Sequence, residues 1–306
     1  MNPSDNPNWF SNNPLQRLNN EEALDDVVGE HLNDPSSLFL PMWCGDPLVT
    51  NGMAAFLAID ARGEFPATAP LVMLGLKDST AYFAIDASAT SEAPEDAPFA
   101  DIGTYMPIRE AAAILPRDDV AIAGQARWLF EWQRKNKFCS VCGSPVNFVN
   151  GGAKSQCGQC EAEHFPRTEP VAIVLAIHEG ACLLGRGPTW PPGFLSALAG
   201  FIEAGETPEE AAKREIFEEA GVTLTNIRYQ FSQPWPFPSS MMMGFIADAQ
   251  DRTLTLDTTE IEEARWIDRK DIQRLLNGEA FEGVFIPPKF TIARQLLERW
   301  ASDKTD

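Results

Sequence analysis

The chain has 306 residues, 44% of them hydrophobic, and carries 24 Lys and Arg residues against 44 Asp and Glu residues. This length and hydrophobic content suffice for two domains or one large domain and exclude a disordered protein. The net charge of −20 opposes nonspecific binding to nucleic acid or to an anionic membrane, because both gain affinity when cations neutralise phosphates. A phosphate-bearing ligand would therefore have to meet local cations or metal ions.

The N-terminal segment, residues 1–20, is rich in Asn and Pro and has no basic segment followed by an apolar run. The longest purely aliphatic stretch in the chain spans only residues 171–177. Neither a signal peptide nor a transmembrane helix is expected, so we expect a cytoplasmic protein with no membrane partner.

Residues 1–133 contain 6 Lys and Arg residues against 20 Asp and Glu residues and are the more acidic part of the chain. Short apolar runs separated by turn-rich segments predict strands here: LFLPMWC, MAAFLAI, PLVMLGL and AYFAI. The sequence VAIAGQARWLFEWQRKN at 120–136 predicts a helix. We expect an α+β accessory domain over residues 1–133, in which no catalytic constellation stands out.

Four of the six cysteines form two C-x-x-C pairs, Cys139 with Cys142 and Cys157 with Cys160. The spacing matches a four-thiolate zinc ribbon, in which each turn presents two sulfurs to one tetrahedral ion. Four thiolates leave no open coordination position, so the Zn²⁺ would be structural. A redox dithiol and two independent disulfides are the alternatives, although a redox pair would not need a second copy. The expected ribbon spans residues 134–168.

The spacing of the remaining histidine and cysteine residues does not indicate that they bind a metal ion. His164 follows Cys160 by four residues and could replace a cysteine as ligand, but a satisfied or exposed histidine is the commoner case. Cys44 and Cys182 are predicted to be ordinary buried thiols.

Two strands and a helix are predicted after residue 169. The sequences PVAIVLAI and ACLLGR, separated by a turn, predict a hairpin or two adjacent strands. Thr207 is a suitable N-cap, Pro208 suits the first helical position, and Glu210 completes a capping box. Gly221 is the expected C-terminal stop, so a helix is predicted between Pro208 and Gly221.

Glu215, Glu218 and Glu219 are spaced i, i+3 and i+4 and therefore crowd one face of this helix. Carboxylates so close repel one another unless cations lie among them. A solvated glutamate-rich face is the common outcome of such a run. The alternative is a site for a divalent ion such as Mg²⁺ or Mn²⁺.

The glutamates belong to a longer pattern with fixed spacing that would arise by chance at below about 10⁻⁹ per start point. Its residues are Gly200, Glu206, Arg214, Glu215, Ile216, Glu218, Glu219, Gly221 and Val222. This pattern is the Nudix box, and the chain resembles the Nudix hydrolases with no box position missing. The resemblance implies an α/β/α sandwich with a mixed sheet over residues 169–306, and hydrolysis of a nucleoside diphosphate linked to another moiety.

The resemblance also implies roles for the box residues. Glu215 and Glu219 would be metal ligands, and Glu218 a further ligand or a helper to the attacking water. Arg214 and Glu206 would pair to orient these carboxylates, since a rigid Arg–Glu pair can hold a ligand helix against its loop.

The segment SQPWPFPSS at 232–240 combines three prolines with two large rings. The prolines restrict the backbone and remove three amide donors, so the segment is predicted to be a stiff ledge and not an ordinary central strand. Its rings could face a ligand or fill the core. A ligand segment for an SH3-like partner is disfavoured, because it contains no P-x-x-P motif.

Together with the ribbon and with PPKFTIA at 287–293, this segment resembles the NADH pyrophosphatase family, which also removes NAD caps from RNA. The resemblance covers about residues 130–300. It implies two further metal ligands, the backbone carbonyl of Ala199 and the carboxylate of Glu260. It places these residues at the substrate: Arg109, Phe165, Phe201, Gln233, Pro234, Trp235, Pro236, Phe237, Pro238, Ser239, Ser240 and Ala293.

Three of these assignments carry a reservation. The family usually has tyrosine at the position of Phe165, so the hydroxyl of one polar substrate contact is absent. Phe201 could instead belong to the core, and Glu260 to a solvated loop.

The expected activity is hydrolysis of the pyrophosphate bond of NAD(H) to nicotinamide mononucleotide and AMP, with Mg²⁺ or Mn²⁺ at the glutamates and Zn²⁺ in the ribbon. The resemblance implies a homodimer. One alternative is the same chemistry on NAD-capped RNA, although the acidic field argues against strong affinity for long RNA. The other is a Nudix protein that senses a nucleotide without cleaving it.

Overall fold

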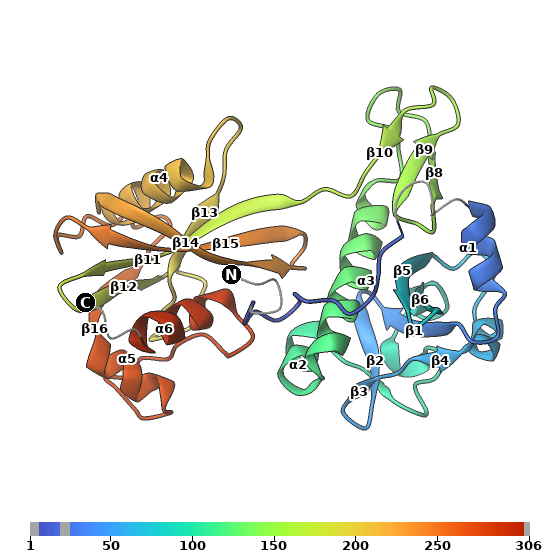
Figure 1. Ribbon diagram of the computed structural model, residues 1–306, viewed down its shortest axis with the longest axis horizontal. Coiled ribbons are helices and arrows are strands. Elements are labelled where there is room, and N and C mark those ends of the chain that lie inside the picture. Colours follow the sequence, from blue (N-terminus) through green and yellow to red (C-terminus); the bar gives the residue numbers. More distant parts are fainter. Residues whose placement is uncertain (1–5, 19–24, 303–306) are drawn as a thin grey trace. The chain divides into compact units, whose positions relative to one another are not determined.

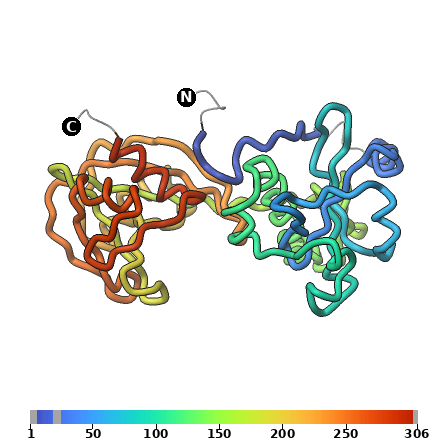
Figure 2. Tube along the Cα trace, turned by 90° about the horizontal axis from the view of Figure 1, so that it is seen from below, coloured from blue at the N-terminus to red at the C-terminus, as the bar shows by residue number. Residues whose placement is uncertain are grey.

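The structure is a computed structural model that describes residues 6–18 and 25–302. These residues form two compact units, which can be followed by colour in Figures 1 and 2. One unit, called here the C-terminal unit, contains residues 169–234 and 240–302 together with residues 6–8. The other, the N-terminal unit, contains the described residues between 9 and 168 together with residues 235–239.

A six-stranded sheet forms the centre of the C-terminal unit. Its strands are β11 (Glu169–His178), β12 (Ala181–Arg186), β13 (Leu198–Phe201), β14 (Leu224–Trp235), β15 (Ser240–Ala249) and β16 (Glu263–Asp268). The strand order is β14-β15-β11-β12-β16, and β13 pairs with β11. Because β11 runs parallel to β15 and antiparallel to β12 and β13, the sheet is mixed, as predicted.

Helices cover both faces of this sheet (Figure 1): α4 (Pro208–Ala220) lies on one face, and α5 (Arg269–Leu276) and α6 (Ile292–Ser302) lie on the other. Side chains of β11 alternate between the two faces, so Val174 packs with α4 while Leu175 packs with α5 and α6. The strand therefore reads as a continuous apolar run. The predicted α/β/α sandwich is confirmed.

Helix α4 begins and ends where its sequence predicts. The Thr207 side chain accepts a hydrogen bond from the Glu210 backbone N–H at 3.2 Å, and the Glu210 carboxylate accepts one from the Thr207 N–H at 2.7 Å. Gly221 closes the helix in the left-handed conformation, with φ of 72°. Both ends of the helix are thus satisfied by local contacts.

The N-terminal unit contains a seven-stranded mixed sheet and three helices. The strands are β1 (Leu38–Trp43), β2 (Asp46–Thr50), β3 (Met53–Ala54), β4 (Leu57–Ala58), β5 (Leu71–Lys77), β6 (Thr80–Asp86) and β7 (Thr104–Tyr105). The helices are α1 (Asp25–Leu32), α2 (Ile108–Ile114) and α3 (Arg117–Lys135), and the 3₁₀ turns are η2 (Ile59–Glu64), η3 (Ala87–Ala89) and η4 (Pro94–Asp96). The order is β3-β2-β1-β6-β5, with β4 paired to β1 and β7 to β2. The predicted α+β organisation is confirmed.

Two details of the N-terminal unit differ from the prediction. The run MAAFLAI does not form one strand, because its two ends pair with different partners: β3 pairs with β2, and β4 pairs with β1. Cys44 is exposed and not buried, because it lies in the turn between β1 and β2 with φ of 50°. Cys182 is buried in β12, as predicted.

The zinc-ribbon segment adds a separate antiparallel sheet to the N-terminal unit. Its strands, in the order β10-β9-β8, are β8 (Val146–Val149), β9 (Lys154–Cys157) and β10 (Glu163–His164). No helix within residues 6–18 and 25–302 is long and apolar enough to cross a membrane.

Replacing the N-cap of α4 should lower stability measurably. Thr207→Ala removes the hydrogen bond to the Glu210 N–H and should lower the free energy of unfolding by about 1 kcal/mol. Urea unfolding of the full chain measures this change. Thr258→Ala, at an exposed loop position, is the control and should stay within about 0.5 kcal/mol of the unsubstituted protein. Equal effects of the two substitutions would contradict the capping role.

Candidate active site

The three box glutamates of α4 differ sharply in exposure. Glu218 is exposed, Glu215 is half-buried, and Glu219 is only 7% exposed. One carboxylate oxygen of Glu219, Oε2, is buried and has no hydrogen-bond partner among the described residues. Burial, followed by the charges of Glu215, Glu260 and Glu218, raises the pKa of Glu219 to about 8. An ionised Glu219 would therefore need a cation beside it.

Arg214 connects these carboxylates to the loop before the helix. Its Nε and Nη2 donate to Oε1 and Oε2 of Glu206 at 2.6 and 2.7 Å, which lowers the pKa of Glu206 to about 2. Its Nη1 donates to Glu215 at 2.8 Å and to Glu218 at 3.1 Å. The bidentate geometry fixes the guanidinium, so Arg214 can hold both glutamates in position.

Gly200 allows strand β13 to approach the helix. A Cβ atom at this position would overlap the carboxylate of Glu215, so any other residue would displace that side chain. The adjacent Phe201 carbonyl accepts a hydrogen bond from Arg214 Nη2 at 2.9 Å. Ala199, whose carbonyl was predicted as a metal ligand, precedes Gly200 in β13 and lies opposite Ile173 of β11.

Glu260 lies in the loop between β15 and β16, which is attached to the end of α4. The Asp257 N–H donates to the Glu219 carbonyl at 3.1 Å, and the Glu260 N–H donates to the Asp257 carbonyl at 3.1 Å. The charge of Glu260 contributes to raising the pKa of both Glu215 and Glu219. The predicted additional ligand is therefore an exposed carboxylate whose charge acts on the box glutamates.

The chemistry of this donor set suits a hard divalent cation, because carboxylate and carbonyl oxygens are the ligands preferred by Mg²⁺ and Mn²⁺. The glutamate oxygens do not already converge: in the described part of the chain, only the four ribbon cysteines bring three or more ligand atoms within 4.8 Å of one another. Binding of an ion would thus draw the carboxylates together. The buried, unpartnered oxygen of Glu219 fits such a ligand.

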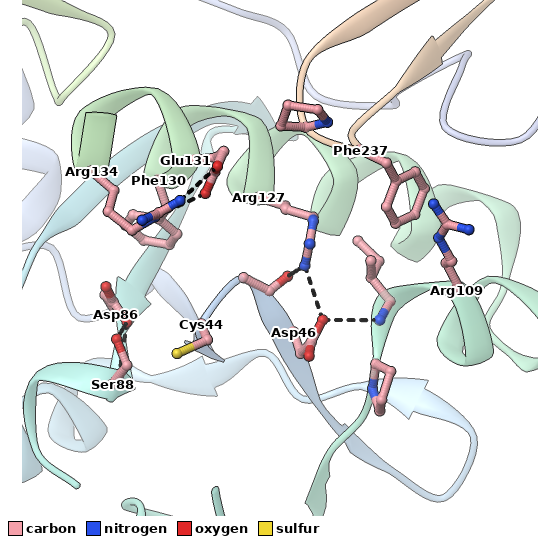
Figure 3. A pocket seen from close by; sticks show the side chains of 14 residues that line it. Cys44, Asp46, Asp86, Ser88, Arg109, Arg127, Phe130, Glu131, Arg134 and Phe237 are labelled. Carbon is pink, nitrogen blue, oxygen red and sulfur yellow. Dashed lines mark hydrogen bonds and ion pairs between the residues drawn. The ribbon is translucent and has the colours of Figure 1, made fainter. Parts of the chain in front are cut away.

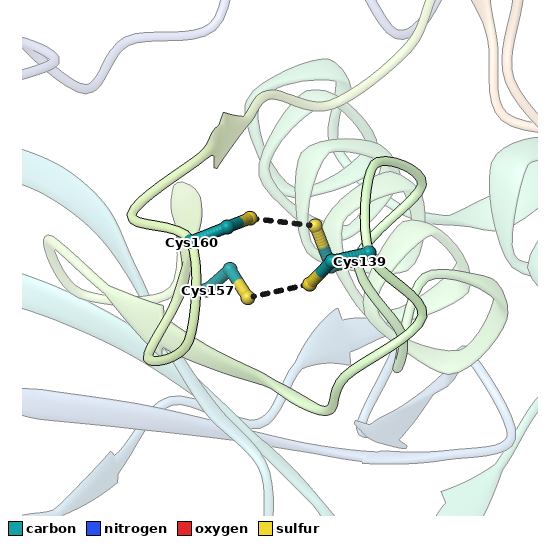
Figure 4. A group of neighbouring side chains, drawn as sticks. Cys139, Cys157 and Cys160 are labelled. Atoms are coloured by element: carbon teal, nitrogen blue, oxygen red, sulfur yellow. Dashed lines mark hydrogen bonds between the residues drawn. The ribbon is translucent and has the colours of Figure 1, made fainter.

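The four ribbon cysteines form one cluster (Figure 4). The Sγ atoms of Cys139 and Cys160 are 3.6 Å apart, and those of Cys142 and Cys157 are 3.5 Å apart. Tetrahedral Zn²⁺ with Zn–S bonds near 2.3 Å separates its sulfurs by about 3.8 Å, whereas a disulfide bond is about 2.05 Å long. The spacing therefore suits one shared ion and not two disulfides.

Neighbouring groups support the cysteine cluster. The N–H groups of Val141 and Gln159 each donate to a sulfur, of Cys139 and Cys157 respectively, at 3.4 Å. His164 Nε2 lies 3.3 Å from Cys139 Sγ, so the histidine is a hydrogen-bond neighbour of a full set of four thiols and does not replace one.

Residues 235–239 of the predicted ledge pack within the N-terminal unit. The rings of Trp235 and Phe237 are 4.8 Å apart, and each meets Phe10 edge to face. The Arg109 guanidinium lies 4.3 Å from the centre of the Phe237 ring, a cation–π contact. Arg127 Nε donates to the Pro236 carbonyl at 2.9 Å. Both ledge rings are half-buried, so they are neither core residues nor fully exposed to solvent.

A cavity of about 790 Å³ adjoins this packing (Figure 3). Three predicted substrate residues line it: Arg109, Phe237 and Pro238. The remaining lining residues are Cys44, Gly45, Asp46, Asp86, Ser88, Pro107, Ile108, Arg127, Phe130, Glu131 and Arg134. Its size is in the range of known small-molecule sites.

The three arginines of the cavity differ in their partners. Arg127 Nη1 is 3.0 Å from Asp46, and Arg134 Nη2 is 2.9 Å from Glu131. Arg109 has no carboxylate partner within residues 6–18 and 25–302, so its charge is available to an anion. The family resemblance implied a role for Arg109, whereas the sequence indicated none for Arg127 or Arg134. The scarcity of cations is a signal for Arg127 but not for Arg134: only 6 Lys and Arg residues occur in residues 1–133, and two of them, Arg109 and Arg127, line the cavity.

Gln233 is fully buried in the C-terminal unit. Its Nε2 donates to the Phe290 carbonyl at 2.8 Å, and its Oε1 accepts from the Ile292 N–H at 2.7 Å. Both ends of the side-chain amide thus hold the backbone that leads into α6. Ala293 follows this backbone and is itself buried in the core. Gln233 therefore braces a predicted substrate segment with its side chain.

Other predicted substrate residues are accessible. Phe201 is 59% exposed, so the alternative that it belongs to the core is wrong. Phe165 is 51% exposed. Ser240 is buried, and Pro234 and Ser239 are half-buried. The predicted substrate residues are divided between the units: Phe201, Gln233, Pro234, Ser240 and Ala293 lie with the carboxylates, and the others lie in the N-terminal unit.

The raised pKa of Glu219 predicts a pH-dependent stability in metal-free protein. Between its usual pKa of 4.5 and about 8, the unfolded chain carries an ionised Glu219 while the folded chain retains the proton. The contribution of this group therefore favours folding below pH 4.5 and is lost as the pH rises toward 8. In chelator-treated protein, Glu219→Gln should be more stable than the unsubstituted chain at pH 8.5, by an amount that shrinks at pH 5.

Thermal unfolding at both pH values, with Glu209→Gln as an exposed control on the same helix, measures this effect. Added Mg²⁺ or Mn²⁺ should raise the melting temperature of the unsubstituted protein more than that of Glu219→Gln. A stability difference between the two proteins that is independent of pH would contradict the buried-carboxyl account.

Three protein-family descriptions match consecutive parts of the chain. Residues 36–132 match the NADH pyrophosphatase-like rudimentary NUDIX domain, residues 134–165 the NADH pyrophosphatase zinc ribbon domain, and residues 166–287 the NUDIX domain. The accessory domain is therefore related to the Nudix fold, which its sequence alone did not indicate. A crystal structure of a NUDIX hydrolase from Nitrosomonas europaea is 26% identical, with a TM-score of 0.44, and covers 55% of this chain and 92% of its own.

Several curated relatives carry the name NAD-capped RNA hydrolase, among them a human and a bacterial protein. The human protein NUDT12 is 39% identical over 196 residues, which are 61% of this chain and 42% of the relative. The Deinococcus radiodurans protein NudC is 34% identical over 252 residues, which are 79% of this chain and 83% of the relative. The chain thus spans less than half of the human relative and most of the bacterial one. It belongs to the NADH pyrophosphatase family of the Nudix superfamily, the family of the NAD-capped RNA hydrolases NudC and NUDT12.

Proposed function

We propose that this protein hydrolyses the pyrophosphate bond of NAD(H) to nicotinamide mononucleotide and AMP. The observation that carries the proposal is the Glu219 carboxyl, buried with an unpartnered oxygen among the charges of Glu215, Glu218 and Glu260. A buried carboxylate without a partner destabilises the fold when it is ionised, whereas a bound cation would compensate its charge. The intact box around it and the family of the chain support pyrophosphate chemistry.

Glu215, Glu219, Glu260 and the Ala199 carbonyl would hold Mg²⁺ or Mn²⁺. When bound, the ion supplies neutralisation of the diphosphate and a lowered pKa for the attacking water. In hydrolysis, the water oxygen forms a bond to one phosphorus while the bond from that phosphorus to the bridging oxygen breaks. The bridging oxygen leaves with the other phosphate.

The residues of this chain orient that reaction. Arg214 donates to Glu215 and Glu218 from the same nitrogen and so fixes the positions of both carboxylates. Glu218 is exposed and can accept the proton of the attacking water. Glu206 fixes Arg214 in turn, and its pKa of about 2 keeps it ionised across the physiological range.

Within the C-terminal unit, recognition of a base of the dinucleotide is assigned to one exposed ring. Phe201 presents an exposed ring next to the box and can stack on a base. Arg109 combines a charge without a carboxylate partner with a face stacked on Phe237, which suits a ligand that carries both phosphate and ring. Zn²⁺ in the ribbon would be structural, because the four thiols leave no open position. The family resemblance implies a homodimer, and we propose a cytoplasmic location.

Removal of the NAD cap from RNA is the second candidate. The names of the human and bacterial relatives favour it. The bond broken is the same in free NAD and in the cap, so the two activities need the same carboxylates. They differ in whether the chain accommodates the RNA beyond the cap.

Glu219→Gln should lower kcat on NADH by at least about 100-fold, because the neutral amide cannot offset the charge of a divalent ion. Product identification by chromatography across NADH, NAD, ADP-ribose and FAD tests both the activity and its selectivity. Glu209→Gln is the matched control and should retain full activity, since it lies exposed in the first turn of α4. Near-normal turnover by Glu219→Gln would refute the assignment. Binding of NADH without release of AMP by the unsubstituted protein would favour a nucleotide sensor.

A further inference from the structure

The C-terminal unit exposes an aromatic cluster that has no part in the site described above. Trp190 is 42% exposed and Phe285 is 62% exposed. Phe194 lies beside them, with its ring centre 5.2 Å from that of Trp190 and the rings at 70°. These three residues, which come from two loops, are called here the aromatic platform.

The backbone of the platform is held rigidly. The Phe285 N–H donates to the Gly193 carbonyl at 2.7 Å, and the Leu195 N–H donates to the Phe285 carbonyl at 2.9 Å. Gly193 has φ of 82°, and a Cβ atom there would overlap the Gly283 carbonyl, so the two loops are in close contact. The rings are therefore preorganised, which lowers the entropic cost of stacking a ligand on them.

Contacts place the platform next to the acidic loop of the site. The Trp190 carbonyl accepts from Arg186 Nη1 at 3.3 Å, and the same nitrogen donates to Glu262 at 2.6 Å. Gly187, at the start of the platform loop, lies against the Glu260 carbonyl. On its other side, Phe285 leads into the segment that Gln233 holds through Phe290.

The charges around the platform do not favour phosphate. Arg186 is already paired with Glu262 and with Glu263, at 2.6 and 3.0 Å. With a net charge of −20, the chain cannot gain strong affinity for a nucleic acid by neutralising its backbone. Stacking of bases on aromatic rings needs no such neutralisation, since every base has a π face.

We propose that Trp190 and Phe285 stack the first bases of single-stranded RNA that follow an NAD cap, and so determine the preference for capped RNA over free NAD(H). This inference rests on the proposed pyrophosphatase function. It makes the platform a specificity-determining surface with no part in bond cleavage. It also accounts for how a strongly acidic enzyme of this family can accept an RNA.

The test compares kcat/KM for NADH with kcat/KM for a short NAD-capped oligonucleotide. Trp190→Ala should lower the value for the capped oligonucleotide about 5- to 100-fold, the range expected for one stacked base, and leave the value for NADH within about twofold. Trp190→Phe should recover most of the loss. Tyr229→Ala, which removes an exposed ring on β14, is the control and should change neither value.

Two further measurements separate stacking from charge. The loss in Trp190→Ala should be the same at low and high salt, because stacking is not screened. It should vanish on a capped chain whose first two nucleotides are abasic. Equal losses on NADH and on the capped oligonucleotide, or no loss on either, would overturn the inference.

Failure of the proposed function has a different signature. If the unsubstituted protein cleaves NADH but not the capped oligonucleotide, the inference is wrong and the pyrophosphatase stands. If the protein cleaves neither, the proposed function fails. The inference then fails with it, and turnover of NADH by the unsubstituted protein is the result that distinguishes the two failures.

Discussion

The carboxyl group of Glu219 lies inside the protein, on a helix that also carries two other glutamates close to it. Burial and like charges act in the same direction on this group, and together they raise its pKa to about 8. A solvated glutamate-rich face would have no such group, since exposed carboxylates keep their charge at little cost. Of the two alternatives that the spacing of the glutamates left open, a solvated face and an ion site, the burial of Glu219 therefore favours the proposed ion site.

The other residues of the box keep the Glu219 carboxyl in place when no ion is bound. Arg214 compensates the neighbouring charges, and it is fixed in turn by both oxygens of Glu206. Gly200 lets β13 pass close to Glu215, where a side chain would push the carboxylate away. The capping box at Thr207 and the left-handed Gly221 define where the helix begins and ends. A shift of one residue at either end would turn Glu219 away from the core, because successive helical residues point about 100° apart.

These box features could be predicted because their determinants are local. The caps of α4, its apolar stripe and the spacing of its glutamates all lie within one short segment, so the sequence shows them directly. The two cysteine pairs are local in the same sense. The cavity of the N-terminal unit could not be found in this way, because it brings Cys44 of a turn together with Arg109 and Arg127 of two consecutive helices that come much later in the sequence. Its arginines carry no pattern of their own.

Gln233 illustrates a second reason why the role of a side chain could not be predicted from the sequence. The sequence indicated an amide in a stiff segment, and the family resemblance suggested a contact with substrate. In the structure both ends of the amide are used by a backbone segment 57 residues further on, near the start of α6. A polar side chain between prolines is as suitable for bracing a neighbouring loop as for binding a ligand, and only the identity of its partner distinguishes the two. The burial of its side chain, with no exposed surface, decides for bracing.

The N-terminal unit matches a rudimentary Nudix domain. Its cavity is lined by three arginines, two of them paired with carboxylates, whereas the box of the C-terminal unit carries glutamates. The two surfaces would treat a phosphate differently, since one needs a metal ion between protein and ligand and the other can contact the anion directly. In the unit with the catalytic box, direct contact would compete with the ion for the same charge. If the box holds a metal ion as proposed, Arg109, which has no carboxylate partner among the described residues, would bind an anion from the accessory domain without competing with that ion.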